Sequence, residues 1–466
     1  MNLAAEVVRD ITKGTDWEGK LFLVGGIVRD PLFGLDEPED IDIVVLGSAI
    51  KLANELFAKG ISEIKPVTYP RFGTSLIRIK GSNVELASAR KESYEKTSRK
   101  PHVKPASLEE DALRRDFTIN SLMRDLFTEE LLDLTKRGLQ DIKDKVLRTP
   151  LDPKITFRDD PLRMLRAVRF KNRFRLRYET NLHSAIVRER ERLNIISNER
   201  IRDELVKMLL HPSAPESLKD LMDLGLLGMF APEFVEGVGI EQGNYHAKDV
   251  WGHTLDVVRE ASSLEIDESK KYFVVLGALF HDIGKPRTKS IEPNGRVRFF
   301  GHERVGADMT KKIMKRLRFS SSDIYKVSSL VQNHMRLGSA NPLTTSAARR
   351  LVRDMSELTE ALILLTECDS RAIGRIPKEI DFEEVRERVS KVKTEGGKRV
   401  LVSPLDGEEI MNLLKIPAGP EVGLWKKRLE EAVIEEEIAI GDKEGAKKLL
   451  KREYKDKVSS KEIIHE

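Results

Sequence analysis

Strand-like hydrophobic patterns occur only in the first 140 residues of the chain, and this asymmetry limits the folds that the chain can adopt. The expected strands are short apolar runs bounded by glycine or charged residues, and they cover Lys20–Gly25, Asp40–Leu46, Ser75–Lys80 and Asn83–Ser88. The helices expected before and between them cover Leu3–Ile11 and Ser48–Lys59. From Asp152 onward the pattern is mostly helical. The sequence therefore predicts an α+β fold in which a mixed unit precedes helical units.

Length and composition narrow the class of protein further. A chain of 466 residues corresponds to about three domains, and 40% hydrophobic residues are enough for sizeable cores. No run of 18 apolar residues occurs, and the first residues lack the basic and apolar regions of a secretory signal. Cys368 is the single cysteine, so a disulfide framework within the chain is impossible. We therefore expect a cytoplasmic protein without a membrane partner.

Positive charge is concentrated in one segment of the chain. The net charge is only 81 − 77 = +4, but residues 158–207 hold 14 lysines and arginines against 8 acids. Twelve of those 14 residues are arginine, whose guanidinium group can fork onto a phosphate or a base edge. The same surplus also fits a solvated helical face. Charge alone therefore makes this segment a candidate nucleic-acid contact and leaves the simpler interpretation open.

Asp40 and Asp42 lie two residues apart on an expected strand. Because side chains alternate along a strand, both carboxylates should lie on one face and close together. Adjacent carboxylates repel one another unless a cation lies between them, and hard oxygen ligands suit a Mg²⁺ ion that carries nucleotide phosphates. Glu85, on another expected strand, could supply a third acid. Two spaced aspartates are by themselves more often a solvated strand edge, so the surrounding motifs decide the interpretation.

Three further motifs accompany the acid pair. Gly25–Asp30 follows a strand, where glycine lets the backbone approach a phosphate that helix N–H groups and Arg29 can bind. Arg114–Asn120 follows the expected hairpin. Asp159–Phe170 is expected to open a helix, with its acids in the cap region and Pro161 at an early helical position. The polar residues spaced by three along one side of that helix are Asp160, Arg163, Arg166 and Arg169.

In this order, the motifs resemble the class II tRNA nucleotidyltransferase family, which includes the CCA-adding enzymes and bacterial poly(A) polymerases. The resemblance covers at least residues 20–210. It implies a polymerase-β-like head in which Asp40 and Asp42 are the metal ligands. The residues that it implies around the nucleotide are Gly26 and Arg29 at the triphosphate, Arg115 at the nucleotide and Asp116 at the ribose.

By the same resemblance, Asp160 and Arg163 form an amino-acid template that pairs with the incoming base, and Arg166 and Arg169 extend that pocket. Arginine offers only hydrogen-bond donors, and a carboxylate offers only acceptors. Cytosine and adenine present an amine and ring acceptors to such a pair, whereas guanine and uracil have carbonyl groups where the amine should be. The template therefore implies selection of CTP and ATP. The family often has glutamate at the position of Asp159.

A second cluster consists of histidines and aspartates, and five of the nine histidines lie between His246 and His334. A single buried histidine is usually a core residue, but this ordered series resembles the HD phosphohydrolase superfamily. Imidazole and carboxylate suit a divalent cation such as Mg²⁺, Mn²⁺ or Ni²⁺. The ligands implied for one metal are His253, His281, Asp282 and Asp369. The residues implied to complete a second metal position are His302 and His334, and Lys285 could contact phosphate.

Four parts are predicted along the chain. They are a nucleotidyltransferase head at 1–140, a basic helical neck with the base template at 141–215, an HD domain at 216–395 and a helical tRNA-binding tail at 396–466. Leu405–Trp425 resembles the segment that ends the body of bacterial CCA-adding enzymes, and it introduces a helix expected to reach about Ile440. The predicted reaction transfers CMP and AMP from CTP and ATP to a tRNA 3′ end with Mg²⁺. The HD domain is a candidate phosphohydrolase.

Several alternatives stay open at this point. The segment Tyr69–Thr74 is closer to the CCA-adding and A-adding pattern than to the basic segment of poly(A) polymerases, yet enzymes that add only CC or only A share most of these motifs. One rival interpretation is an untemplated poly(A) polymerase. Another is an HD phosphohydrolase whose head serves binding or regulation, against which the intact Asp40 and Asp42 pair argues. A non-catalytic RNA-binding protein is a weaker rival, because both sets of candidate metal ligands are complete.

Overall fold

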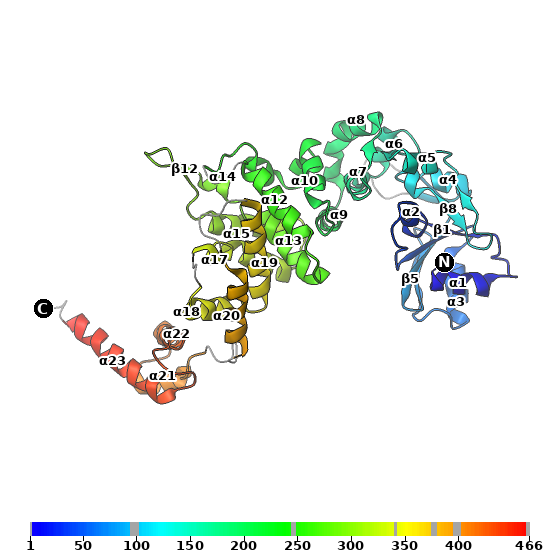
Figure 1. The fold of residues 1–466 in the computed structure, drawn as a ribbon. Coiled ribbons are helices and arrows are strands. Elements are labelled where there is room, and N and C mark those ends of the chain that lie inside the picture. Colours follow the sequence, from blue (N-terminus) through cyan, green and yellow to red (C-terminus); the bar gives the residue numbers. More distant parts are fainter. Residues whose placement is uncertain are drawn as a thin grey trace. The chain divides into compact units, whose positions relative to one another are not determined.

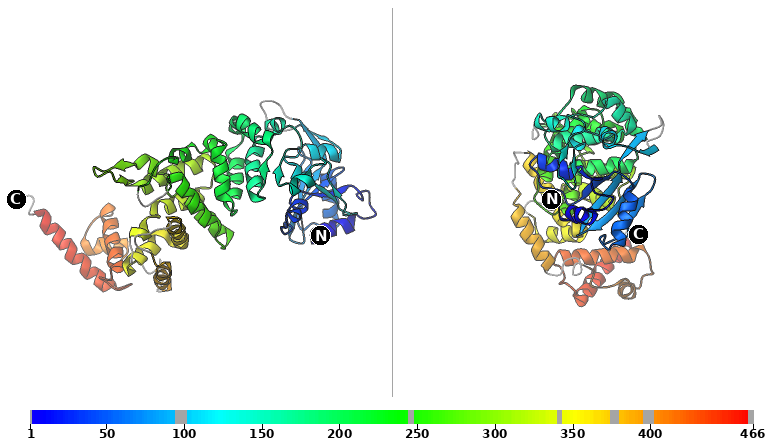
Figure 2. Two further views of the ribbon diagram at one scale, coloured as in Figure 1. Left: turned by 45° about the horizontal axis from the view of Figure 1, so that its top comes forward. Right: turned by 90° about the vertical axis from the view of Figure 1, so that its right-hand side faces the viewer.

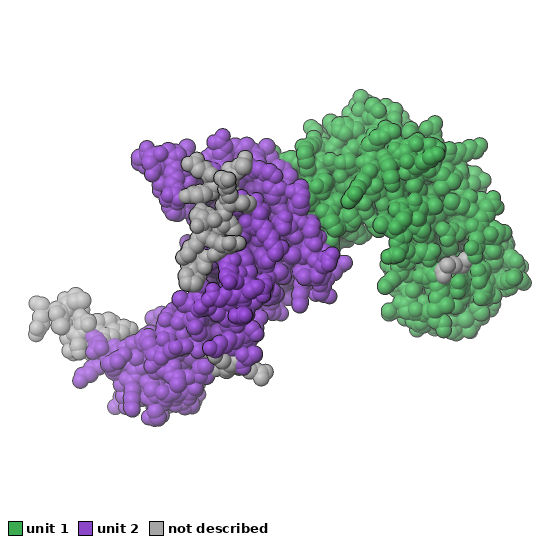
Figure 3. Space-filling model, in the orientation of Figure 1, with its two compact units in different colours: residues 1–235, 316–318 green, residues 236–315, 319–466 purple. Residues whose placement is uncertain are grey.

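The computed structural model describes residues 2–93, 102–243, 248–339, 343–373, 380–394 and 402–462. They form two compact units, one of residues 1–235 and 316–318 and the other of residues 236–315 and 319–466 (Figure 3). The predicted division into four parts is finer than these two units, and its boundaries stay predictions. The boundary predicted between residues 395 and 396 lies outside the described residues.

The first unit contains a seven-stranded mixed sheet in the order β3-β4-β5-β2-β1-β8-β9 (Figure 1). Its strands are β1 (Leu21–Val24), β2 (Ile41–Val45), β3 (Val67–Tyr69), β4 (Thr74–Ile79), β5 (Ser82–Ser88), β8 (Met123–Asp125) and β9 (Leu131–Leu132). β2 is antiparallel to β1 and parallel to β5, and β4 and β5 form the expected hairpin. β1 is buried along its whole length, as its uninterrupted apolar sequence predicts.

Helices and a small hairpin complete this part of the first unit. The helices are α1 (Leu3–Thr12), α2 (Gly26–Leu32), α3 (Ala49–Ala58), α4 (Leu108–Leu113) and α5 (Gly138–Lys143), and the hairpin pairs β6 (Arg90–Ser93) with β7 (His102–Pro105). α3 packs on β4 and β5 through a buried face that includes Leu52 and Leu56. The turn from β1 into α2 requires Gly25, because its φ is 74° and a Cβ there would lie 2.7 Å from Asp42 Oδ2.

The rest of the first unit is mainly helical, as predicted. Its elements are α6 (Pro153–Asp159), α7 (Leu162–Arg173), α8 (Thr180–Glu189), α9 (Asn198–Leu209), α10 (Ala214–Asp223) and α11 (Leu227–Phe230), with the short parallel strands β10 (Val146–Leu147) and β11 (Arg177–Tyr178). The acids before Pro161 lie where one helix ends and the next begins, and Asp160 Oδ1 accepts a hydrogen bond from the backbone N–H of Leu162, as expected for a cap region. α6 ends at Asp159, and Asp160 is extended at φ −139° and ψ 102° because a residue before proline disfavours the α conformation.

The second unit is built around α13 (Glu268–Phe280), whose residues Val274–Phe280 are all buried. α13 packs against α12 (Val250–Ser262), α16 (Ser321–Asn333) and α19 (Thr359–Ile373), as the green and yellow helices in two further views also show (Figure 2). A helix surrounded in this way has no solvated face, which explains its unbroken apolar run. The remaining elements are α14 (Lys285–Thr288), β12 (Ser290–Ile291), β13 (Val297–Arg298), α15 (His302–Arg316), α17 (Arg336–Ser339), α18 (Thr345–Met355) and α20 (Phe382–Thr394).

The last part of the second unit consists of α21 (Gly407–Leu414), α22 (Pro420–Ile434) and α23 (Lys443–Glu462). α22 begins at the expected Pro-Ala-Gly-Pro turn but ends at Ile434, six residues before the predicted end. In the part of the chain that the structure describes, no helix is both long enough and apolar enough to cross a membrane.

Candidate functional site

The sheet brings two of the predicted catalytic acids together. β2 and β5 are parallel neighbours, and their register pairs Asp42 directly with Glu85. The carboxylate of Asp42 also lies against Gly25, which has no side chain to exclude it. Burial, reinforced by the negative charge of Glu85, raises the pKa of Asp42 to about 6. This arrangement of paired acids beside a glycine turn fits a hard divalent cation.

Asp40 lies differently from the sequence prediction. It comes one residue before β2 rather than within it, and it is exposed. Its Oδ1 accepts a hydrogen bond from Asn83 Nδ2 at 3.2 Å. Among the described residues, the compact groups of three metal-ligating atoms do not include Asp40, Asp42 and Glu85. The acids of the head are therefore neighbours, but Asp40 is turned toward Asn83.

Arg29, predicted to hold the triphosphate with Gly26, is engaged inside the protein. Its Nε donates to Asp30 Oδ1 at 2.7 Å, and one terminal nitrogen donates to Asn120 Oδ1 at 2.6 Å. The guanidinium group also lies against the rings of Phe170 and Phe174, at 4.9 and 4.8 Å from their centroids. Arg29 therefore ties α2 to α7, and its contact with a triphosphate stays a prediction.

Asp116 is the centre of a buried polar network between the sheet and α7. Its carboxylate accepts hydrogen bonds from Asn120 Nδ2 at 2.9 Å and from Arg166 Nε at 2.7 Å. Burial alone would raise the pKa of Asp116, but Arg166 and Asn120 lower it to about 2. The network continues to Glu204 on α9, whose Oε2 accepts from Arg169 Nε at 2.7 Å. Arg166 and Arg169 thus join α7 to Asp116 and to α9, whereas their part in a base pocket and the ribose contact of Asp116 stay predictions.

The predicted template residues lie at the start of α7. Arg163 donates to the carbonyl oxygen of Arg114 at 2.8 Å. Asp160 Oδ2 is 2.7 Å from a terminal nitrogen of Arg200, which the sequence analysis had not singled out. Arg115, the remaining predicted nucleotide contact, is 3.0 Å from Asp111 Oδ2. The structure therefore brings these predicted residues into one region of the first unit, where each is held by another residue of the same chain.

The histidines and aspartates of the second unit converge from the ends and faces of several helices. His253 lies on α12 and Asp369 on α19, His281 and Asp282 follow α13, His302 begins α15 and His334 follows α16. Two compact groups result, and the ligand atoms within each group all lie within 4.8 Å of one another. The groups are His253, His281 and Asp369, and Asp282, His302 and His334.

Three of the histidines are oriented by the backbone. Nδ1 of His281, His302 and His334 lies 2.7–2.8 Å from the carbonyl oxygen of Ala278, Phe299 and Val331, respectively. A protonated Nδ1 in these contacts leaves each Nε2 as an acceptor, and the Nε2 atoms of His302 and His334 are only 3.2 Å apart. Burial and then the nearby His281 lower the pKa of His334 to about 4, so it is neutral at pH 7. Imidazole Nε2 atoms that face one another in this way are well placed to bind a cation.

Asp282 lies between the two groups. Its Oδ2 is 3.1 Å from His281 Nε2, and its Oδ1 is 3.4 Å from His302 Nε2. The family pattern implies Asp282 as a metal ligand, and in the structure one of its oxygens faces each group. Oδ2 is buried without a well-directed hydrogen bond, although Lys285 Nζ is 2.6 Å away. A buried carboxylate with one oxygen facing each group of ligands fits a metal ligand shared by both groups.

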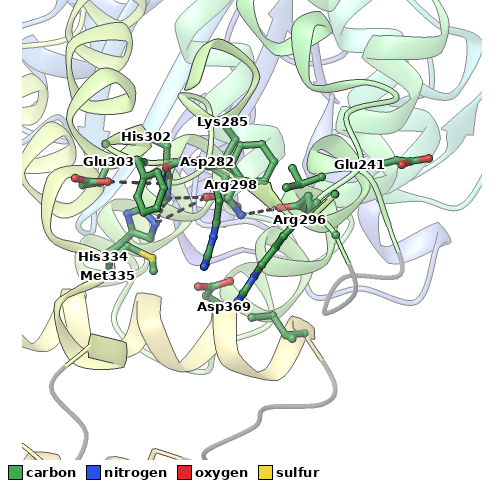
Figure 4. A pocket seen from close by; sticks show the side chains of 18 of the residues that line it. Glu241, Asp282, Lys285, Arg296, Arg298, His302, Glu303, His334, Met335 and Asp369 are labelled. Atoms are coloured by element: carbon green, nitrogen blue, oxygen red, sulfur yellow. Dashed lines mark hydrogen bonds and ion pairs between the residues drawn. The ribbon is translucent and has the colours of Figure 1, made fainter. Parts of the chain in front are cut away.

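A pocket of about 1160 Å³ opens onto these residues (Figure 4). The hairpin of β12 and β13 lines it, and the side chains of Arg296 and Arg298 extend into it. The side chain of Arg298 is paired with Glu292 at 3.2 Å. Within the described residues, the side chain of Arg296 has no hydrogen bond or ion pair. The pocket therefore combines candidate metal ligands with cationic groups that suit a phosphate.

Comparison with known proteins agrees with both sites. Three family models match the chain, namely the Poly A polymerase head domain at 21–148, the Probable RNA and SrmB- binding site of polymerase A at 176–237 and the HD domain at 250–372. The CC-adding tRNA nucleotidyltransferase of Thermus thermophilus is 32% identical over 438 residues, which are 92% of this chain and 92% of that protein. The chain belongs to the class II tRNA nucleotidyltransferase family.

Other relatives extend this result. The A-adding tRNA nucleotidyltransferase of Deinococcus radiodurans is 33% identical over 345 residues, which are 70% of this chain and 76% of that protein. The crystal structure of the Bacillus stearothermophilus CCA-adding enzyme in complex with CTP matches 99% of this chain and 100% of its own, with a TM-score of 0.70 and 20% identity. The predicted fold class is thereby confirmed. The protein is an enzyme of this family that carries an HD domain.

Several residues of this nucleotidyltransferase site had been missed in the sequence. Glu204 could have been found, because it lies on the apolar face of α9 with Ile201, Leu205 and Met208, and an acid on such a face needs a buried partner. Asn83 and Arg200 gave no such signal. Their partners are more than 35 residues away in the chain, and local periodicity says nothing about contacts over such a distance.

Proposed function

We propose that the protein adds CMP and AMP from CTP and ATP to the 3′ end of tRNA and releases pyrophosphate. The observation that carries this proposal is the pairing of Asp42 with Glu85 beside the Gly25 turn, in the same unit as Asp160 and Arg163. Two relatives named as A-adding and CC-adding tRNA nucleotidyltransferases support the same reaction class.

The residues of the first unit would divide the work of this reaction. Asp40, Asp42 and Glu85 would hold Mg²⁺, which when bound would stabilise the charge on the transferred phosphate and on the departing pyrophosphate. Arg163 would donate to the ring acceptors of cytosine or adenine, and Asp160 would accept from the base amine. The network of Asp116, Arg166 and Glu204 would keep this pocket in shape while substrates exchange.

The exposed arginines of the basic segment are the candidates for tRNA contact. Six arginines of this segment each pair with an acid of the first unit and are therefore engaged within the protein; they are Arg158, Arg166, Arg169, Arg173, Arg200 and Arg202. Arg175, Arg177 and Arg188 are exposed. They would bind backbone phosphates, as suits an A-form helix that is recognised by shape, and their loss would reduce the salt dependence of binding.

The decisive experiment is incubation with labelled CTP or ATP and with tRNAs that end before, within or after the CCA sequence. Full CCA addition predicts use of CTP on the shortest tRNA and of ATP after two cytidines. A CC-adding or A-adding enzyme would use only one of the two nucleotides. Addition of long runs of AMP to any RNA would support the poly(A) polymerase alternative.

We further propose that the HD pocket hydrolyses phosphoesters with divalent metal ions. The supporting observation is that two groups of metal-ligating residues open into a pocket lined by Lys285, Arg296 and Arg298. Bound Mg²⁺, Mn²⁺ or Ni²⁺ would supply Lewis acidity at the phosphorus, and the cationic side chains would orient the phosphate. Assays with a phosphomonoester and a phosphodiester in each metal would test this proposal. No turnover above that of a His281→Ala, Asp282→Ala variant in any metal would refute it.

A further inference from the structure

Arg200 forms a forked contact with the predicted template acid. It lies in the first turn of α9, and its two terminal nitrogens are 3.3 Å from Asp160 Oδ1 and 2.7 Å from Asp160 Oδ2. Asp160 Oδ1 also accepts a hydrogen bond from the backbone N–H of Leu162 at 3.2 Å. Both oxygens of Asp160 are therefore held, and the plane of its carboxylate is restricted.

Stability alone gives little reason for this ion pair. A cation in the first turn of a helix faces the positive end of the helix dipole, which is unfavourable. The side chain of Arg200 is 39% exposed, and ion pairs with such exposure usually contribute little to folding. The contact of α7 with α9 is already made by Arg169 and Glu204, whose side chains are only 12% and 4% exposed. The structural role of joining these helices therefore belongs to the deeper pair.

We propose that Arg200 is a positioning residue that determines nucleotide selectivity by fixing the orientation of Asp160. This inference rests on the proposed transfer of CMP and AMP. An aspartate carboxylate can rotate about its last side-chain bond, and only some orientations direct a lone pair toward the base amine. The fork of Arg200 occupies one edge of the carboxylate and leaves the other lone pairs for the base.

The geometry of the fork, rather than its charge, is the expected cause. Lysine at position 200 would keep a positive charge near Asp160 but could not contact both oxygens in one plane. Uracil and guanine present a carbonyl oxygen where cytosine and adenine present the amine, and a fixed Asp160 carboxylate repels that oxygen. Once the carboxylate can turn away, these two bases would be rejected less strongly. Loss of the fork should lower the use of CTP and ATP more than the use of UTP and GTP.

The test compares Arg200→Met and Arg200→Lys with the wild-type protein and with Arg202→Met. Arg202 is a matched control, because it lies on the same helix but pairs with Asp203 and with the carbonyl oxygen of Arg318. The measurement is kcat/KM for each of the four nucleotides on a tRNA acceptor. We expect the preference for CTP and ATP over UTP and GTP to fall roughly tenfold in Arg200→Met, and nearly as much in Arg200→Lys, which keeps the charge but not the fork. The preference of Arg202→Met should equal that of the wild type.

An unchanged preference in Arg200→Met, with a wild-type melting temperature, would overturn the inference. So would a lower KM for CTP at an unchanged preference, since Arg200 would then merely block the site. If Arg200→Met does not fold, an unchanged preference in Arg200→Lys overturns it instead. A wild-type protein that adds no nucleotide to any tRNA would overturn the proposed function, and the inference with it, so the two failures are distinguishable.

Discussion

The acid site of the head and the histidine site of the HD domain are built in opposite ways. In the HD domain, six ligand residues lie on or next to five helices and already form two compact groups. In the head, Asp42 and Glu85 are paired by strand register, but Asp40 is bonded to Asn83 instead. The fold itself assembles the HD site. In the head, the acids are neighbours, but they are not gathered into one group.

The difference follows from the charge of the ligands. Imidazole rings carry no obligatory negative charge and can be packed against one another, and backbone carbonyls orient three of them through Nδ1. Carboxylates carry like charges, so bringing three of them together costs electrostatic energy that only a cation can offset. A site rich in histidine can therefore be preorganised, whereas a site made of acids is completed when the metal and its nucleotide arrive.

The largest expected effect is on the chemistry of the head. Asp42→Ala removes the acid that faces both Glu85 and the glycine turn, and metal stabilisation of a transferred phosphate is worth several kcal/mol. Nucleotide addition should fall at least about a thousandfold, while tRNA binding and the metal content of the HD domain stay unchanged. Labelled-nucleotide incorporation and a filter-binding assay measure the two properties. Addition at a near wild-type rate would show that the head assignment is wrong.

The next prediction concerns metal retention without substrate. Because the HD ligands are already gathered, the nucleotide-free protein should keep a divalent metal through gel filtration, and that metal should be lost in the His281→Ala, Asp282→Ala variant. The affinity of the HD site for the metal should fall by more than about a hundredfold in this variant. Elemental analysis gives the metal content, and continued CMP and AMP transfer by the variant is the control. Equal metal content in both proteins would refute the HD assignment.

A smaller effect is expected at the template. Asp160→Ala removes the acceptor for the base amine, so the preference for CTP and ATP over UTP and GTP should fall roughly tenfold to a hundredfold. The alternative is that Asp160 only caps α7 through its hydrogen bond with Leu162. A capping role would lower the melting temperature and leave the preference intact. Incorporation of all four nucleotides, measured on a folded variant, distinguishes the two roles.

The smallest effect directly tests the contrast between the two sites. Asn83→Ala releases Asp40 from an exposed hydrogen bond, which is worth about 1 kcal/mol or less. The Mg²⁺ concentration needed for half-maximal nucleotide addition should therefore fall about two- to fivefold. Asn83→Asp, which adds a like charge beside Asp40, should instead raise it. A Mg²⁺ requirement that is the same in all three proteins would mean that Asn83 does not restrain Asp40.

Much of both sites could be predicted from short patterns. The strand that carries Asp42, the Gly25 turn and the hairpin with Glu85 all lie within local stretches whose periodicity predicts them. The HD residues were named from the order of their motifs, but their division between two metal groups was not, since Asp282 faces both. The cap region predicted before α7 is also local, because Pro161 favours an extended Asp160 and that conformation lets the Asp160 carboxylate accept the N–H of Leu162.

The sequence by itself determined which elements form and which residue types carry the chemistry, because hydrophobic period, glycine turns and motif order are local properties of the chain. Only the tertiary structure decided that Arg29 lies against two phenylalanine rings, that Asn83 holds Asp40 and that Arg200 forks onto Asp160. Each of these contacts joins residues about 40 or more positions apart. Their partners are selected by how helices and strands pack, and no local pattern contains that information.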